Sequence, residues 1–116
     1  MITGLHTIIY AHDADKVRAF LHDVLGLKSV DAGHGWLIFA APPAEIATHP
    51  ADGGQPHHEL SLMCDDLKVT MQELADKGVK CGAITEARWG SITSIPLPGG
   101  GELGLYQPKH PTALNI

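Results

Sequence analysis

The sequence predicts an α+β fold in which paired βαβββ modules form a curved mixed sheet around a cup-shaped cavity. One pattern occurs twice: the apolar-rich runs 5–13 and 58–66 each end in an Asp, and a helical pattern follows each Asp. An internal repeat of this kind defines the architectural unit. Each half also contains one helical pattern among four strand patterns, which argues against a doubly wound parallel sheet. We therefore expect one domain over residues 1–116, made of modules at about 4–50 and 57–108.

The first module is expected to begin with a strand at 4–11 and to continue with a helix. Asp13 is the N-cap candidate, because its carboxylate can accept hydrogen bonds from the free N–H groups of the first helical turn. Gly26 is expected to end this helix in a left-handed conformation. Three short strands follow near 27–31, 35–40 and 44–49, and a loop rich in Pro and Gly covers 50–56. The apolar residues at the spacing of one helical face are Val17, Phe20, Leu21, Val24 and Leu25.

The second module repeats this order. A strand is expected at 58–64, and Asp65 or Asp66 caps a helix that ends at Gly78. Strands follow near 80–84, 91–96 and 102–107, and we expect the tail from Pro108 to be an arm or disordered. The residues of the helical core face are Leu67, Thr70, Met71, Leu74 and Ala75.

Charge and composition exclude several classes of protein. The net charge of −5 argues against a nucleic-acid or anionic-membrane surface. No apolar run reaches ~18 residues, so no membrane span is expected, and the first residues lack the basic and apolar regions of a signal peptide. The two cysteines, Cys64 and Cys81, are not in a CxxC spacing. We therefore expect a reduced cytoplasmic protein.

Four of the expected strands carry polar side chains on the face that should not pack under a helix. Alternate residues of a strand point to opposite faces, and on each of these strands one face is apolar. A polar second face is also what any half-exposed antiparallel sheet shows, so solvent exposure alone is an alternative explanation. Its recurrence on four strands, around the small residues Ala47 and Gly104, favours a concave ligand site. The side chains on this face are His6, Tyr10, Glu45, His49, Glu59, Ser61, Glu102 and Tyr106.

This arrangement resembles the vicinal oxygen chelate superfamily, which includes glyoxalases, bleomycin resistance proteins and extradiol dioxygenases. The resemblance covers about residues 4–108. It is carried by His6, by the helix that ends in Leu25-Gly26-Leu27, by Asp65-Asp66-Leu67 and by Pro98-Gly99-Gly100-Gly101 before the last strand. The fold signal is fairly specific, whereas the function signal is weak because one fold hosts many activities.

The resemblance also implies where a metal would bind. In metal-dependent members the ligands lie in the first, fourth, fifth and eighth strands. His6 and Glu59 occupy two of these positions, whereas Ala47 and Gly104 occupy the others. A third ligand would have to be Glu45 or Glu102, and a catalytic ion generally needs three protein ligands. The sequence therefore leaves open whether the chain binds a divalent metal (Fe, Zn, Ni or Mn) or no metal at all.

Three hypotheses for the function follow from this pattern. The first is a small-molecule-binding protein without the full metal set, whose ligand would contact Tyr10, His49, Ser61, Trp89 and Tyr106. The second is a metal-dependent lyase or isomerase, or an extradiol-type dioxygenase, that uses His6, Glu59 and Glu45 or Glu102. The third is an interaction domain with no small ligand. In each case we expect a homodimer, because relatives cover their open edges by pairing subunits.

Overall fold

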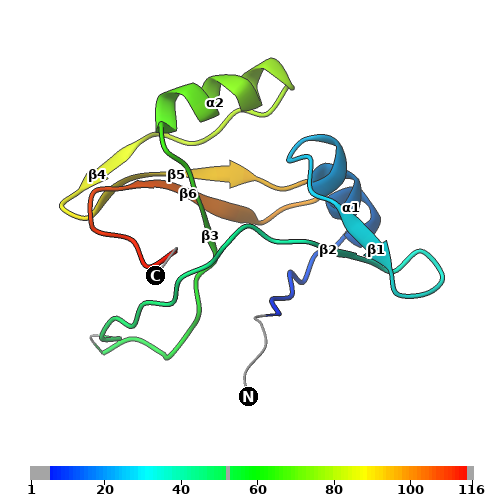
Figure 1. Cartoon of the computed structure of the whole chain (residues 1–116), viewed down its shortest axis with the longest axis horizontal. Coiled ribbons are helices and arrows are strands. Elements are labelled where there is room, and N and C mark those ends of the chain that lie inside the picture. The colour runs from blue at the N-terminus through cyan, green and yellow to red at the C-terminus, as the bar shows by residue number, and fades with distance from the viewer. Residues whose placement is uncertain (1–5, 52, 115–116) are drawn as a thin grey trace.

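The computed structural model describes residues 6–51 and 53–114. The described chain contains two helices and six strands, and the α+β class is as predicted. Helix α1 (Ala14–Asp23) precedes an antiparallel ribbon of β1 (Ser29–Asp31) and β2 (Leu37–Phe39). The second half contributes β3 (Ser61–Met63), α2 (Leu67–Asp76), β4 (Thr85–Ala87), β5 (Gly90–Pro96) and β6 (Glu102–Pro108). These four strands form a mixed sheet in the order β3-β6-β5-β4, as Figure 1 shows.

Both helices begin at the predicted Asp residues. The Asp13 carboxylate accepts a hydrogen bond from the Lys16 backbone N–H at 3.1 Å, and the Asp66 carboxylate accepts one from Val69 at 3.2 Å. These bonds satisfy N–H groups that have no partner within a helix. Beyond α1, Gly26 has a φ of +69° and its N–H donates to the His22 carbonyl at 3.1 Å. The predicted left-handed end of the first helix is therefore confirmed.

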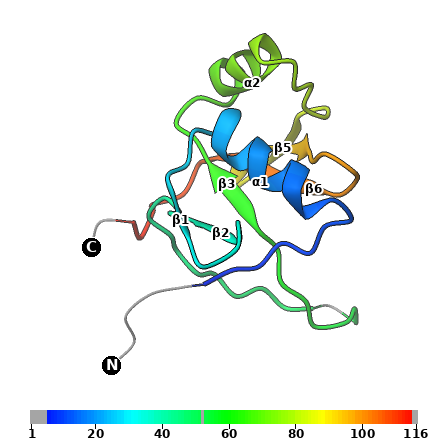
Figure 2. The ribbon, with the colours of Figure 1, turned by 90° about the vertical axis from the view of Figure 1, so that its right-hand side faces the viewer.

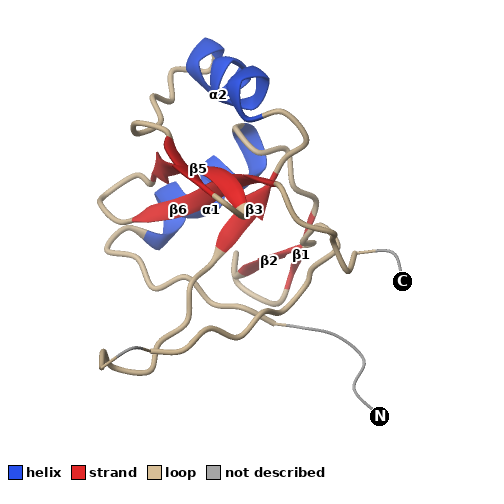
Figure 3. Cartoon of the chain, turned by 90° about the vertical axis from the view of Figure 1, so that its left-hand side faces the viewer, coloured by secondary structure: helices blue, strands red, loops and turns tan. Residues whose placement is uncertain are grey.

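The core lies between the two helices and one face of the four-stranded sheet. Figures 2 and 3 show the sheet from its two ends, with α1 across it and α2 above. Phe20 of α1 and Leu67 and Leu74 of α2 pack in one cluster with alternate residues of β5 and β6. The sheet residues of this cluster, with the adjoining loop residue Leu97, are Ile95, Leu97, Leu103 and Leu105.

The opposite face of this sheet is free of helices. On β6, Leu103 and Leu105 are buried, whereas Glu102, Gly104 and Tyr106 alternate with them and face the other way. The segment that joins the modules and the C-terminal tail both lie on the side of the sheet away from α2 (Figure 1). Both helices contain ten residues, and neither is long and apolar enough to cross a membrane within the described chain.

Three predicted strands are absent from the described residues. Residues 6–11 of the expected strand 4–11 are not in a strand, and neither are 44–49 or 80–84; residues 4 and 5 lie outside the described part. Strand β4 forms at 85–87 instead. Residues 80–84 do lie beside β5, since the Gly82 N–H donates to the Ser94 carbonyl at 3.0 Å. The other two segments lack a partner in the described chain, and a strand is stable only when its N–H and C=O groups pair with a neighbouring strand. In the described chain, residues 6–12 and 41–50 make no backbone–backbone hydrogen bond.

The arrangement is consequently open. In the described chain the β1–β2 ribbon of the first module and the mixed four-stranded sheet are two separate sheets, so the mixed sheet is open and not closed by the first module. The radius of gyration is 15.2 Å, compared with about 13 Å for a compact domain of this length. The division into two modules of one domain remains a prediction.

Candidate binding site

The open face of the four-stranded sheet has a floor of small residues. Gly104 pairs with Ser61 of β3 on one side and with Ser94 of β5 on the other. Directly opposed residues of neighbouring strands share a face, so these three residues form one row across the sheet. A Cβ atom at Gly104 would overlap the Ser61 hydroxyl oxygen, which lies over this glycine. The middle of the open face therefore carries only small side chains.

Larger aromatic and polar side chains lie next to these small residues and surround Tyr106. We call the group of Glu45, His49, Trp89, Tyr106 and His110 the Tyr106 cluster. The Trp89 ring lies edge-on to the Tyr106 ring at 5.9 Å and edge-on to the His49 ring at 6.5 Å between centroids. The His110 ring is tilted against Tyr106 at 6.0 Å. Edge-to-face contacts of this kind are favourable because the positive edge of one ring meets the negative face of the next.

Glu45 connects the segment between the modules to the C-terminal tail. Its Oε1 accepts a hydrogen bond from the Tyr106 hydroxyl at 3.3 Å, and its Oε2 accepts one from the Ala113 backbone N–H at 2.8 Å. The tail is also tied to the β4–β5 turn, because the Lys109 N–H donates to the Trp89 carbonyl at 2.8 Å. Described residues of the tail are thus held in place, so of the two predicted alternatives, an arm or disorder, disorder does not hold for them.

The proton on Tyr106 is firmly held. Burial is the main cause that raises the pKa of its hydroxyl above the ordinary value, and the charge of Glu45 and the hydrogen bond to that carboxylate act in the same direction. The phenol is therefore neutral at physiological pH. In this state Tyr106 is a hydrogen-bond donor beside a carboxylate acceptor.

The structure brings together four of the predicted site residues: Glu45, His49, Trp89 and Tyr106. Ser61 lies on the same face, because it pairs with Gly104, which is two residues before Tyr106 on β6. His110 was missed by the sequence reasoning. It lies beyond the last strand, between two prolines, where no periodicity indicates which way a side chain points.

The other predicted residues lie apart from this cluster or are exposed. Tyr10 is 91% exposed, and His6 and Glu102 are also exposed. The Glu59 carboxylate pairs with His57 Nε2 at 3.5 Å on the surface. The hydrogen bond between His57 and the Gln55 carbonyl, with a smaller effect of Glu59, raises the pKa of His57.

The metal ligands implied by the resemblance are not assembled. In the part of the chain that the structure describes, no group of three or more His, Cys, Asp or Glu side chains could hold a metal ion. His6, Glu59 and Glu45 or Glu102 therefore do not fit a shared ion in this arrangement. No reaction step can be derived through such an ion.

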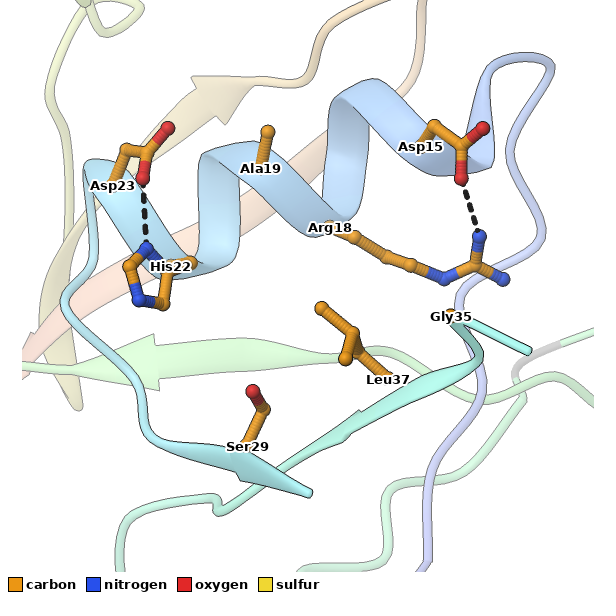
Figure 4. A pocket seen from close by; sticks show the side chains of 8 residues that line it. All are labelled: Asp15, Arg18, Ala19, His22, Asp23, Ser29, Gly35 and Leu37. Carbon is orange, nitrogen blue, oxygen red and sulfur yellow. Dashed lines mark hydrogen bonds and ion pairs between the residues drawn. The ribbon is translucent and has the colours of Figure 1, made fainter. Parts of the chain in front are cut away.

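A hollow lies elsewhere, between α1 and the β1–β2 ribbon, with a volume of about 470 Å³ (Figure 4). Its charged groups are already paired. Arg18 binds Asp15 at 2.9 Å and stacks over the Trp36 ring at 4.8 Å, and His22 binds the neighbouring Asp23 at 2.7 Å. These internal pairs leave few groups to recognise a ligand, whereas the Tyr106 cluster presents ring edges, a hydroxyl and an imidazole.

Comparison with known proteins gives a result for the fold only. No family model matches the chain. No curated protein matches it either. Among solved structures, TnmS3, an antibiotic binding protein from Streptomyces sp. CB03234, is 22% identical with a TM-score of 0.63, and the match covers 90% of this chain and 100% of that one.

Two further structures show the same likeness. Lactoylglutathione lyase from Agrobacterium tumefaciens is 19% identical with a TM-score of 0.59, and the match covers 87% of this chain and 90% of that one. A glyoxalase/bleomycin resistance protein from Streptomyces sp. CB03234 is 24% identical with a TM-score of 0.57, over 84% of this chain and 93% of that one.

The chain has the glyoxalase fold. The fold expected from the resemblance to the vicinal oxygen chelate superfamily is confirmed, since solved structures of this fold include one named as a glyoxalase/bleomycin resistance protein and one named as a member of the glyoxalase/bleomycin resistance protein/dioxygenase superfamily. Identities below 25% do not carry an activity across. The glyoxalase fold places the Tyr106 cluster on the open face of the sheet, and the chemistry of these side chains has to support any function.

Proposed function

We propose that this chain binds a small organic molecule on the open face of its four-stranded sheet, against Trp89 and Tyr106. The observation that carries the proposal is the Tyr106 cluster, in which aromatic rings surround a hydroxyl and a carboxylate next to a floor of small residues. Ligand sites combine apolar and aromatic walls with a few polar groups that fix orientation. The fold is compatible with such a role, because TnmS3, which resembles this chain in fold, is named as an antibiotic binding protein.

The ligand expected here has a flat unsaturated part and at least one hydrogen-bonding group. Trp89 is 46% exposed at the β4–β5 turn, so part of this residue remains accessible to a flat partner. The Tyr106 hydroxyl and the His49 and His110 rings supply polar contacts around it. A ligand that stacks on Trp89 would gain apolar contact area, and its polar group would exchange water for these side chains.

Tryptophan fluorescence tests the proposal. The chain has two tryptophans, Trp36 and Trp89, so the Trp36→Phe variant leaves Trp89 as the sole reporter. Titration with a panel of flat aromatic compounds should quench this emission and raise the thermal midpoint, because a ligand of the native state stabilises it. Trp89→Ala should abolish the rise in the midpoint, whereas Trp36→Phe should preserve it. A panel that never shifts the midpoint of the wild type would reject the proposal and favour an interaction domain.

The open arrangement supports a homodimer as the active form. The segments 6–12 and 41–50 have no backbone partners in the described chain, and Ile8 and Ile46 within them are largely exposed. The cross-strand neighbours Val30 and Ile38 of the β1–β2 ribbon are exposed as well. Unpaired strand-like edges with apolar side chains favour pairing with another chain. A second copy of the chain, related by two-fold symmetry, would cover both the unpaired segments and the exposed residues of the ribbon.

Sedimentation velocity at micromolar concentration tests this assembly. We expect a dimer for the wild type and a monomer for Ile46→Asp, since Ile46 is 81% exposed and its replacement leaves the core unchanged. Lys80→Asp, an exposed change outside the unpaired segments, is the control and should remain dimeric. A wild-type monomer would contradict the proposal for the assembly but not the one for ligand binding.

A further inference from the structure

Three metal-ligating atoms converge in the Tyr106 cluster, away from His6 and Glu59. The Tyr106 hydroxyl oxygen lies 3.1 Å from His110 Nε2 and 3.3 Å from Glu45 Oε1, and the last two atoms are 3.9 Å apart. Ligand atoms on a tetrahedral ion, with bonds of about 2.0–2.1 Å, are separated by about 3.3 Å. The three atoms therefore already stand close to the spacing of three ligands around one ion.

The tautomer of His110 adds an independent observation. Its Nδ1 lies 2.7 Å from the Pro111 carbonyl oxygen, which can only accept a hydrogen bond. In the neutral ring Nδ1 therefore carries the proton, and the lone pair of Nε2 points toward Tyr106 and Glu45. Histidines that bind metals almost always donate their other ring N–H in this way.

With His110 neutral, the group has two acceptors and one donor. The Glu45 carboxylate and His110 Nε2 both accept, and the Tyr106 hydroxyl has one proton to share between them. The second carboxylate oxygen of Glu45 is held by the Ala113 N–H, which fixes its orientation. Glu45 and His110 are both mostly buried, at 16% and 32% side-chain exposure. A cation at this point would meet three oriented donors.

We propose that Glu45, Tyr106 and His110 form a binding site for a divalent transition-metal ion, for which Zn²⁺ is the natural probe. An imidazole nitrogen with two oxygen ligands suits zinc and its neighbours. When Zn²⁺ binds, the Tyr106 O–H bond breaks, a Zn–O bond forms, and the proton passes to the buffer. No electron is transferred. This site does not depend on the organic ligand proposed above, because the three side chains are in place without it.

Calorimetry and ultraviolet difference spectra on the full chain, without an affinity tag, test the site. We expect one Zn²⁺ per chain, an observed binding enthalpy that varies with the ionisation enthalpy of the buffer because a proton is released, and the difference band of a tyrosinate. Tyr106→Phe, Glu45→Gln and His110→Ala should each weaken Zn²⁺ binding by at least about tenfold, since even the loss of an outer partner costs about 10–100-fold. Tyr106→Phe keeps the ring and should also remove the tyrosinate band.

Two control variants separate this site from adventitious binding. The only other tyrosine, Tyr10, is 91% exposed, so Tyr10→Phe should retain the band. The surface pair of His57 and Glu59 is a competing place for zinc, and His57→Ala should leave the affinity unchanged. Zn²⁺ binding without a tyrosinate band in the wild type would overturn the proposal. So would no binding, or binding that His57→Ala abolishes. Circular dichroism of each variant confirms that a loss of binding is not a loss of fold.

Discussion

Replacement of Gly104 by alanine should destabilise the protein, although alanine is normally the better residue within a strand. Glycine in a strand costs about 0.5–1 kcal/mol relative to alanine because it loses more backbone freedom on folding. An added Cβ at position 104, however, would overlap the Ser61 hydroxyl oxygen and lie 3.1 Å from Ser61 Cβ and 3.3 Å from the Leu60 carbonyl oxygen. Overpacking of this kind typically costs about 1–3 kcal/mol. The steric term exceeds the entropic gain, and we expect a net loss of about 1 kcal/mol.

The loss is measurable and should depend on one atom. For a domain of roughly 100 residues, about 1 kcal/mol lowers the thermal midpoint by about 4–8 °C. In the Ser61→Ala background the overlapping oxygen is gone, whereas the Cβ of residue 61 and the Leu60 carbonyl remain, so Gly104→Ala should then cost clearly less than in the wild type. The coupling between the two substitutions, read from a double-mutant cycle, isolates the contact.

Ser94 supplies the matched control. It pairs with Gly104 from the other side, but its hydroxyl oxygen is directed toward Gly82, 2.8 Å from where a Cβ there would stand. Ser94→Ala should therefore add independently to Gly104→Ala. The reasoning is refuted if Gly104→Ala alone raises the thermal midpoint, or if Ser94→Ala rescues it as well as Ser61→Ala does.

Three further outcomes follow from the caps, the core and the thiols. Asp66→Ala removes the hydrogen bond to the Val69 N–H and should lower the free energy of unfolding in urea by about 0.5–2 kcal/mol, whereas Asp66→Asn should lose much less. Phe20→Ala leaves a cavity between α1 and the sheet and should cost about 3–5 kcal/mol by the same measurement. Burial raises the pKa of both Cys64 and Cys81, so fewer thiolates form at a given pH, and both should react with a disulfide reagent more slowly than free cysteine at pH 8, with the rate rising at higher pH. Reaction as fast as free cysteine would contradict this assignment.

The helices and the strands β3, β5 and β6 were predictable because their signals are local. An Asp before an apolar stripe marks a helix start wherever the rest of the chain lies, and both caps are found where expected. The alternation along 102–107 correctly placed Leu103 and Leu105 under the helices and Tyr106 on the open face. The strands expected at 4–11 and 44–49 have similar alternation, but pairing depends on a neighbour, and periodicity does not reveal whether a neighbour is within reach.

The candidate site shows the same division. Parity along each strand indicated that Glu45, His49 and Tyr106 belong to one surface, and their convergence with Trp89 follows in the structure. The same reasoning grouped His6 and Glu59 with them, whereas both side chains are exposed away from the cluster. Alternation along a strand indicates which face of the sheet a side chain lies on but not where on that face. It therefore could not separate His6 and Glu59 from the residues of the Tyr106 cluster.

By itself, the chain's order of residues determined the α+β class, the two capped helices and the face on which the polar side chains lie, since each depends on residues a few positions apart. Only the tertiary structure decided that the tail returns to the sheet, that His110 meets Tyr106 and Glu45, and that the first module remains open. These features depend on contacts between residues up to 68 positions apart, such as the hydrogen bond from Ala113 to Glu45. Such contacts form only when the whole core brings the segments together, and no local pattern encodes them.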